Sequence, residues 1–201
     1  MRESDGHGNV LIVGVGGQGT ILASDILAAA AIEAGLDAKK SEIHGMSQRG
    51  GSVFSHVRFS EKVYSPVIPE GEVDILVSLE EMETARWLNL LKTDAKLIIS
   101  GTRILPAGVT EYPEGIVPAI KQAGYSCSFI PAETLAKSAG GIQYENVFIL
   151  GLLSRMLNFP VSAWYAAIEK SVPAGTFAAN RAAFDAGATS VASEASAGDV
   201  S

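Results

Sequence analysis

The chain is poor in the residues from which metal and redox centres are built. Its 201 residues include one cysteine, Cys127, and three histidines. One cysteine cannot form a disulfide within the chain, and this set cannot hold a zinc ion or an iron–sulfur cluster. We therefore expect no metal site, and we interpret Cys127, in the apolar-rich run Tyr125 to Ile130, as a buried structural thiol.

Charge and long apolar runs are also scarce. Charged residues make up 18% of the chain and the net charge is −7, so the basic face that general nucleic-acid binding needs is not expected. No apolar run reaches the ~20 residues that span a bilayer. The polar start, Met1 to Gly8, lacks the apolar core of a signal peptide. These features predict a cytoplasmic protein with no nucleic-acid or membrane partner.

Familiar catalytic signatures are missing too. We find no paired carboxylates of the glycosidase type, no Ser/His/Asp signature and no lysine after Gly19 that would make a P-loop. His44 could act as an acid or base, but a lone histidine is more often structural. No catalytic residue is assigned.

What the chain does contain is an alternation of strand-like and helix-like segments. With 47% hydrophobic residues, it suits one globular domain over residues 9–186, between a flexible start (1–8) and a disordered tail (187–201). The alternation predicts a Rossmann-like three-layer α/β sandwich with a mostly parallel sheet and an antiparallel hairpin. Strands are expected at Val10–Val13, Asp37–Ile43, Ser52–Ser60, Asp74–Leu79, Lys96–Ser100 and Ser126–Ile130, and helices at about Gln18–Ala34, Glu80–Leu91, Gly115–Ala123, Ala132–Ser138, Glu145–Leu157, Ser162–Lys170 and Gly175–Ala186.

Three of these segments carry further expectations. The strand Ser52–Ser60 is expected to form the hairpin with Val63–Tyr64 through a short turn. The helix Glu80–Leu91 is expected to turn Met82, Ala85, Leu88 and Leu91 toward the core. The helix Glu145–Leu157 is apolar nearly all round, which predicts burial in this chain or against a partner.

The first candidate site is a glycine turn between the first strand and the first helix. Strand, glycine turn and helix are the context of a dinucleotide-type phosphate loop, although many such turns bind no nucleotide. Gly14 would let the chain turn, Gly16 would let the backbone approach a ligand, and Gly19 would let the helix pack closely. We expect an anion-facing turn at Gly14, Gly16, Gly17, Gln18 and Gly19.

The second candidate site follows the second strand. In a doubly wound sheet it would lie beside the glycine turn, where such sheets place ligands. Arg49, flanked by glycines, could bind a phosphate or carboxylate, or could simply be solvated. Glu42 lies roughly where a ribose-binding acid would be, although Lys39 and Lys40 precede it. The whole loop comprises His44, Gly45, Met46, Ser47, Gln48, Arg49, Gly50 and Gly51.

Together the two segments, GVGGQGT and EIHGMSQRGGSV, resemble the gamma-type domain of 2-oxoacid:ferredoxin oxidoreductases, and above all its form in the indolepyruvate enzymes. The run from His44 to Gly51 points to that form. Further agreement comes from Asp74-Ile-Leu-Val with Glu80 after it, and from Asn146 in ENVFILGLL. The resemblance covers about residues 9–186.

The resemblance implies a subunit that works with a larger alpha subunit. The partner would hold thiamine diphosphate, Mg²⁺ and iron–sulfur clusters, coenzyme A would be a co-substrate, and ferredoxin would accept the electrons. The reaction implied is the oxidative decarboxylation of aryl 2-oxo acids such as indolepyruvate. The loop His44–Gly51 would reach the shared active site, and the isolated chain would be inactive.

Two other functions remain open on the residues alone. A stand-alone oxidoreductase that uses a nicotinamide or flavin would explain the glycine turn, but it lacks a catalytic constellation. A non-catalytic module that binds a nucleotide or coenzyme A would need no large partner. Titration with nucleotides and copurification from the native source discriminate among the three.

Overall fold

A six-stranded sheet forms the centre of the computed structural model, which describes residues 6–44, 51–106 and 108–190. In this sheet β1, β4, β5 and β6 run parallel, whereas β3 is antiparallel to both of its neighbours, β1 and β2. The predicted α/β fold with a mostly parallel sheet is confirmed. In spatial order the strands are β2 (Asp37–His44), β3 (Ser52–Ser60), β1 (Gly8–Val15), β4 (Val73–Ser78), β5 (Leu91–Ser100) and β6 (Ser126–Ile130).

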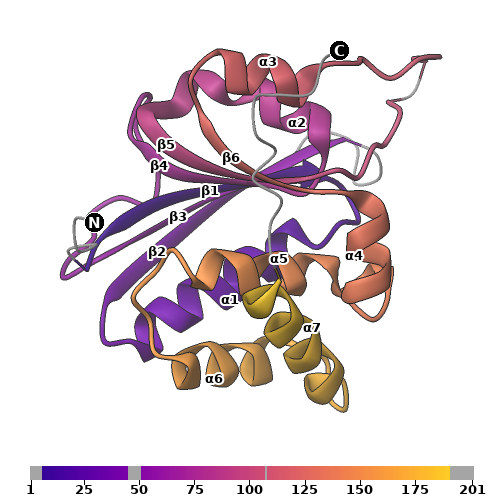
Figure 1. Cartoon of the computed structure of the whole chain (residues 1–201). Helices are drawn as coiled ribbons and strands as arrows, with labels where there is room; N and C mark the ends of the chain where they lie inside the picture. Colours follow the sequence, from indigo (N-terminus) through magenta and orange to yellow (C-terminus); the bar gives the residue numbers. More distant parts are fainter. Residues whose placement is uncertain (1–5, 45–50, 107, 191–201) are drawn as a thin grey trace.

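Helices cover both faces of this sheet and complete three layers (Figure 1). Alternation along β1 builds two cores, because Val10 and Ile12 join one apolar cluster and Leu11 and Val13 join the other. No helix in the described part of the chain is both long and apolar enough to cross a membrane. One face carries α1 (Thr20–Glu33), α4 (Ala132–Ser138), α5 (Glu145–Ser154), α6 (Val161–Ser171) and α7 (Phe177–Thr189), and the other carries α2 (Glu81–Arg86) and α3 (Ile116–Gln122).

The antiparallel part of the sheet differs from the predicted hairpin. Both edges of β3 are occupied, one by β2 and the other by β1, so no edge remains for Val63–Tyr64. That segment is a loop instead. The Val63 N–H donates to the carboxylate of Asp37 at 2.9 Å, which satisfies it without a strand partner. The prediction of an antiparallel pair was right, but the predicted partner was wrong.

The helix predicted over Glu80–Leu91 is shorter and presents a different face. It ends at Arg86, and a 3₁₀ turn, η1 (Leu88–Leu90), leads into β5. Ala85 is exposed, whereas Glu81 and Glu83 are buried. The expected apolar face is confirmed at Leu88 and Leu91, which join the second apolar cluster, but not at Ala85. Polar partners on β3 and on the segment after β5 hold the two carboxylates inside the fold.

The buried helix α5 packs within this chain, against α7. A Cβ on Gly151 would overlap the Phe184 carbonyl, and one on Gly187 would overlap the Phe148 carbonyl, so the two backbones cross in close contact. Gly187 therefore belongs to α7, not to the predicted tail, and Gly8 belongs to β1. Helix α7 continues to Thr189, and of the two predicted flexible ends only 1–5 and 191–201 lie outside the described residues.

Candidate functional site

The carboxyl ends of β1 and β4 define the natural ligand position of this sheet. The chain leaves β1 into α1 on one face, and it leaves β4 into α2 on the other face (Figure 1). The two connections diverge, which opens a crevice at the edge of the sheet. Such switch points are where open α/β sheets bind ligands.

The glycine turn lies at this crevice, but its glycines act differently from the prediction. Gly14 is still extended within β1, and a Cβ there would lie 2.9 Å from the Gln18 Oε1 and 3.1 Å from the Leu79 Cβ. Gly14 therefore permits close packing and makes no turn. Left-handed backbone occurs at Gly17 (φ 105°) and at Gly19 (φ 78°), where a Cβ would overlap the amide of Asn146 on α5. Gly19 thus allows α1 to approach α5, rather than the sheet.

The amide of Gln18 ties the turn to the sheet. Its Oε1 accepts from the Val15 N–H at 2.7 Å, and its Nε2 donates to the Leu79 carbonyl at 2.6 Å. The side chain therefore bridges the ends of β1 and β4. Both ends of its amide are bonded to backbone, so Gln18 positions the turn.

A cavity of about 460 Å³ opens between the turn and the start of α5. Leu22, Leu79 and Ile149 contribute apolar walls, whereas Gln143 and Glu145 contribute polar groups. An apolar cleft with a few convergent polar groups is the usual form of a small-molecule site. The remaining lining residues are Gly16, Gly17, Gln18, Gly19, Thr102, Ile104, Ile142 and Asn146.

The electrostatics of this cavity are mixed. Helix α1 begins at the left-handed Gly19 with no side-chain cap, and its first N–H groups favour negative charge. The Thr20 hydroxyl is buried and has no hydrogen-bond partner among the described residues. Across the cavity, burial raises the pKa of Glu145, although a 3.5 Å hydrogen bond from the Thr102 hydroxyl lowers it in part. An anion at the turn therefore has Glu145 for a neighbour.

The second predicted segment reaches the glycine turn. The Gly51 carbonyl accepts from the Gly16 N–H at 2.9 Å, and His44 is the last residue of β2. The structure thus brings together the ends of both candidate segments, as the doubly wound fold predicts. Gly45, Met46, Ser47, Gln48, Arg49 and Gly50 lie outside the described residues.

Glu42 does not suit the ribose-binding role considered above. It pairs with Lys40 on the same strand, and Lys40 also pairs with Asp25 of α1 at 2.5 Å. Lys40, one of the two lysines that precede Glu42 in the sequence, is therefore the ion-pair partner of the Glu42 carboxylate. The His56 Nδ1 accepts from the Ile68 N–H at 3.2 Å, which gives this histidine a structural role. Cys127 packs against the second apolar cluster but is half-buried, and not fully buried as predicted.

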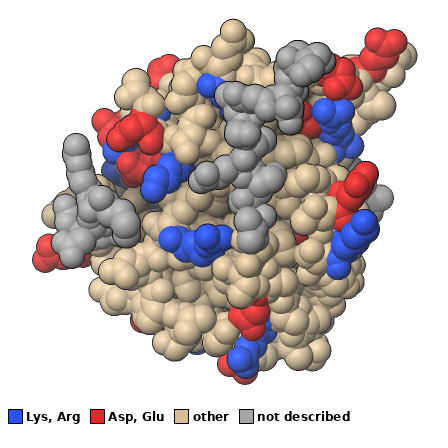
Figure 2. Space-filling view, viewed as in Figure 1, with Lys and Arg blue, Asp and Glu red and all other residues tan. Residues whose placement is uncertain are grey.

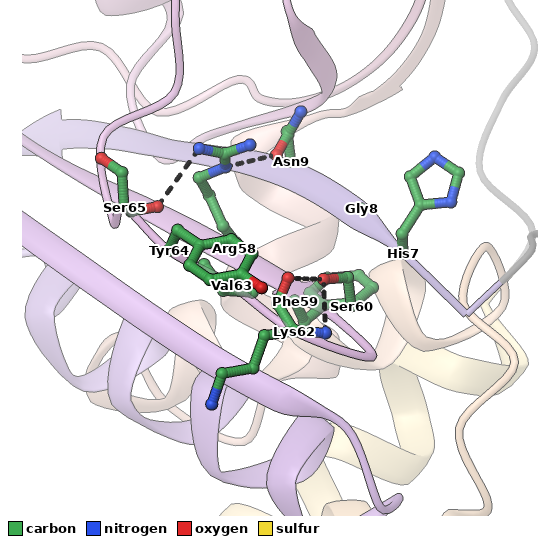
Figure 3. A pocket seen from close by; sticks show the side chains of 10 residues that line it. All are labelled: His7, Gly8, Asn9, Arg58, Phe59, Ser60, Lys62, Val63, Tyr64 and Ser65. Carbon is green, nitrogen blue, oxygen red and sulfur yellow. Dashed lines mark hydrogen bonds between the residues drawn. The ribbon is translucent and has the colours of Figure 1, made fainter.

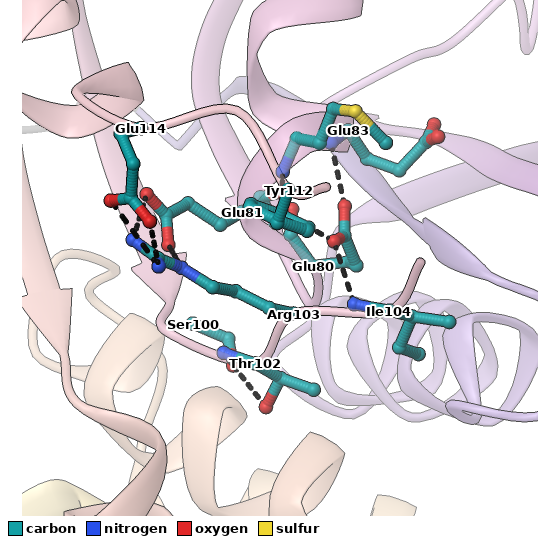
Figure 4. Close-up of polar contacts among 11 residues, drawn as sticks. Glu80, Glu81, Glu83, Ser100, Thr102, Arg103, Ile104, Tyr112 and Glu114 are labelled. Atoms are coloured by element: carbon teal, nitrogen blue, oxygen red, sulfur yellow. Dashed lines mark hydrogen bonds and ion pairs between the residues drawn. The ribbon is translucent and has the colours of Figure 1, made fainter. Parts of the chain in front are cut away.

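Residue-by-residue reasoning did not anticipate the buried acids beside the crevice. Glu80 is fully buried, and it accepts hydrogen bonds from the Tyr112 hydroxyl at 2.5 Å and from the Ile104 N–H at 3.1 Å (Figure 4). The Glu83 carboxylate accepts from the Ser52 hydroxyl at 2.5 Å, which joins α2 to the start of β3. The available signal is the occurrence of three acids, Glu80, Glu81 and Glu83, within four residues directly after a strand.

A second cavity, of about 350 Å³, lies at the opposite edge of the sheet (Figure 3). Two cationic side chains line it: Arg58 donates to Asn9 at 2.9 Å and to the Ser65 and Val67 carbonyls at 3.2 Å, and Lys62 pairs with Asp37 at 3.8 Å. These bonds use the guanidinium to hold the loop after β3. We therefore assign this cavity a structural role. On the face shown in Figure 2, acidic and basic side chains intermix and form no field of one sign.

Comparison with known proteins decides the family. The model of the pyruvate ferredoxin/flavodoxin oxidoreductase family matches residues 9–190. This chain belongs to that family. It is 38% identical to the indolepyruvate oxidoreductase subunit IorB of Pyrococcus horikoshii and 39% identical to that of Thermococcus kodakarensis, with 89% of this chain and 93% of each relative covered.

A solved structure of the family shares the fold. The keto/oxoacid ferredoxin oxidoreductase gamma subunit of Geobacter sulfurreducens superposes with a TM-score of 0.67 at 26% identity, over 90% of this chain and 94% of that one. The chain is thus a subunit of a 2-oxoacid:ferredoxin oxidoreductase. The predicted resemblance is confirmed across nearly the whole chain.

The residues that suggested the family have separate places in the fold. Asn146 donates to the Gly19 carbonyl at 3.1 Å and so joins the starts of α1 and α5 at the crevice. Asp74 lies at the opposite edge, where it accepts from the Asn9 N–H at 2.8 Å and from Lys92 at 2.6 Å. Of the family features outside the two loops, Glu80 and Asn146 therefore belong to the site, and Asp74 stabilises the far end of the sheet.

Proposed function

We propose that this chain is the smaller subunit of an enzyme that oxidatively decarboxylates indolepyruvate and other aryl 2-oxo acids. The products are the arylacetyl-CoA, CO₂ and reduced ferredoxin. The observation that carries the substrate class is the identity of 38–39% to the IorB subunits, over 89% of this chain. The run His44 to Gly51, on which the resemblance to the indolepyruvate enzymes rests, supports it.

Thiamine diphosphate, Mg²⁺ and the iron–sulfur clusters belong, in this proposal, to the larger alpha subunit. Bound there, they supply the carbanion-stabilising and electron-carrying chemistry. The residues of this chain do not fit a cluster, because its one cysteine lies on β6, half-buried, and burial raises the pKa of the thiol. Among the described residues no group of three His, Cys, Asp or Glu could hold a metal ion.

The contribution of this chain is to complete the shared active site. The glycine turn, braced by Gln18 and Asn146, presents the start of α1 to the crevice. In this proposal the loop His44–Gly51, whose Gly51 carbonyl is bonded to the Gly16 N–H, also contributes to the active site shared with the partner. We assign no covalent or proton-transfer role to any residue here, and coenzyme A and the oxo acid carry the anionic groups that this edge would meet.

Arg49→Ala tests the loop. In the assembled complex, loss of a hydrogen bond to a charged group costs roughly 1.5–3 kcal/mol, which is about ten- to a hundred-fold in kcat/KM. Steady-state kinetics with each substrate varied in turn measure the loss. A higher KM for coenzyme A alone assigns Arg49 to the coenzyme, and a change for the oxo acid alone assigns it to the substrate.

The matched control is Arg181→Ala on α7, where the guanidinium lies over the Tyr165 ring, 4.4 Å from its centroid. Kinetics unchanged in this control, with a loss in Arg49→Ala, support the proposal. If Arg49→Ala has wild-type kinetics for both substrates, the loop is a structural contact and its proposed role is wrong.

The cavity at the switch point also favours a second candidate, a module that binds a nucleotide without a large partner. The pairing of Glu42 with Lys40 and the presence of Glu145 count against it. Copurification from the native source discriminates between the two. A larger subunit that copurifies supports the proposal, whereas a chain that purifies alone and binds NAD(H), NADP(H) or FAD supports the module.

A further inference from the structure

The segment between β5 and α3 projects from the carboxyl edge of the sheet as an arm (Figure 1). We define the arm by residues 101–106 and 108–115, and Ala107 has no part in the argument. It contains no helix or strand among these residues. A projecting segment of this length needs specific contacts to keep one conformation.

Helix α2 supplies those contacts at the base of the arm, through Glu80 (Figure 4). The carboxylate accepts from the Ile104 N–H on the outgoing half of the arm and from the Tyr112 hydroxyl on the returning half. The same hydroxyl accepts from the Met82 N–H at 2.7 Å. Because burial and the bond to Glu80 raise the pKa of Tyr112, its hydroxyl keeps the proton that it donates.

Arg103 adds a second fastening on the other side of α2. Its Nε donates to the Glu81 carboxylate at 2.7 Å, and its Nη1 donates to Glu114 at 3.2 Å. The guanidinium lies over the Tyr112 ring, 5.0 Å from the centroid. The two halves of the arm are therefore held together and to the domain through two buried carboxylates, those of Glu80 and Glu81.

The tip of this braced arm is apolar and exposed. Leu105 is 50% exposed and Val109 is 44% exposed. A hydrogen bond of 3.1 Å from the Val109 N–H to the Pro106 carbonyl closes the tip. Contacts fix the base of the arm, yet its apolar side chains stay largely in water, which is unfavourable for a free surface.

The tip does not stand alone at this edge. Ile21 lies in the first turn of α1, Ile43 precedes the last residue of β2, and Ile142 lies on η2 (Ile142–Tyr144) and lines the cavity. Each is exposed, Ile142 by 77%. Exposed apolar side chains from separate elements, at the edge that holds the cavity, form the pattern of a protein interface.

We propose that the arm is a pre-organised anchor whose apolar tip, Leu105 and Val109, docks on the larger subunit. This inference rests on the proposed function, which requires such a subunit. The family relatives are themselves subunits, and the arm leaves the same edge as the glycine turn and Gly51. Bracing the arm before association lowers the entropy lost when the complex forms.

Binding of the purified chain to the immobilised larger subunit tests the anchor. Leu105→Asp and Val109→Asp place a charge at the tip without touching the brace, and each is expected to raise the Kd by about tenfold or more. The matched controls are Ile32→Asp on α1 and Val161→Asp on α6, whose side chains are 56% and 55% exposed and whose helices cover the face of the sheet opposite α2 (Figure 1). Both controls should stay within about twofold of the wild type.

Tyr112→Phe tests the brace separately, because it removes the hydroxyl and leaves the tip unchanged. Weaker binding by a variant that circular dichroism shows to be folded supports pre-organisation, and unchanged binding contradicts that part. Tip variants that bind as tightly as the controls overturn the anchor and leave the proposed function standing. A wild-type chain that binds no larger subunit overturns both. If the tip variants instead dissociate a dimer of this chain, the occupant is a second copy and the proposal is wrong.

Discussion

Gly19 is constrained twice, by its backbone and by its neighbour. Its φ of 78° is unfavourable for any residue with a side chain, and a Cβ would overlap the amide of Asn146. Gly17 has only the first constraint, because a Cβ there would meet open space at φ 105°. The two positions of one turn therefore separate backbone strain from close packing.

We expect Gly19→Ala to destabilise the chain more than Gly17→Ala. Strain at positive φ costs about 1–3 kcal/mol, and Gly19→Ala adds the displacement of Asn146, whose amide holds the Gly19 carbonyl. Urea unfolding of both variants measures the difference. If both variants lose the same free energy of unfolding, α5 can move away from Gly19 at no cost, and Asn146 does not stabilise the turn.

The stability of the folded chain depends on pH through His56. Burial lowers the pKa of this imidazole, and its Nδ1 must be unprotonated to accept the Ile68 N–H. The unfolded chain binds the proton more readily, so the stabilisation is complete above the ordinary value of about 6.5 and declines as the pH falls through the lowered pKa.

We therefore expect the midpoint of thermal unfolding to fall between about pH 6.5 and 5. His56→Gln is the control, since it keeps a polar side chain and removes the titration. A variant with the same pH dependence as the wild type would contradict this assignment.

At the scale of single residues, chemistry that depends on neighbours could not be predicted. The positions of the glycine turn and of Gly51 were foreseeable, because a strand–glycine–helix pattern fixes where a doubly wound sheet turns. The burial of Glu80 was not, since its partners Ile104 and Tyr112 lie far along the chain. Local patterns carry no information about such contacts.

Among the elements, the crossing of α5 and α7 is the closest contact. Gly187 was expected in a disordered tail, because a stretch rich in Ala, Ser and Gly suits a flexible end as well as a tight helix crossing. Likewise, the antiparallel pair was foreseeable from the alternation along β3, but its partners were not. Periodicity identifies an element, whereas the element beside it depends on the whole sheet.

Gly187→Val should destabilise this crossing by about 1–3 kcal/mol or more, as overpacking of a core does. The side chain would have to displace the Phe148 carbonyl of α5. Ala182→Val, at an exposed position of the same helix, introduces the same side chain without the contact, and helix propensity disfavours it more than Gly187→Val because Ala is the better helix former. Denaturant unfolding that shows similar losses in both variants would contradict the crossing.

At the scale of the whole molecule, we propose that this chain is a subunit that completes an active site held mainly by its partner. The fold, the family and the meeting of the two loop segments were predictable from the sequence. The arm was not, because its exposed tip and its buried fastenings are visible only in three dimensions. In the functions proposed here, the meeting point of the two loop segments and the arm both act only together with a second chain.

The most direct test of this central claim is reduction of a viologen dye by indolepyruvate and coenzyme A, with thiamine diphosphate and Mg²⁺ supplied. It is measured for this chain alone, for the larger subunit alone and for the two combined. We predict activity only in the combined sample, since this chain has one cysteine and no cluster to accept electrons from the substrate. Coenzyme A-dependent dye reduction by the pure chain alone, or full activity of the larger subunit without it, would contradict the account.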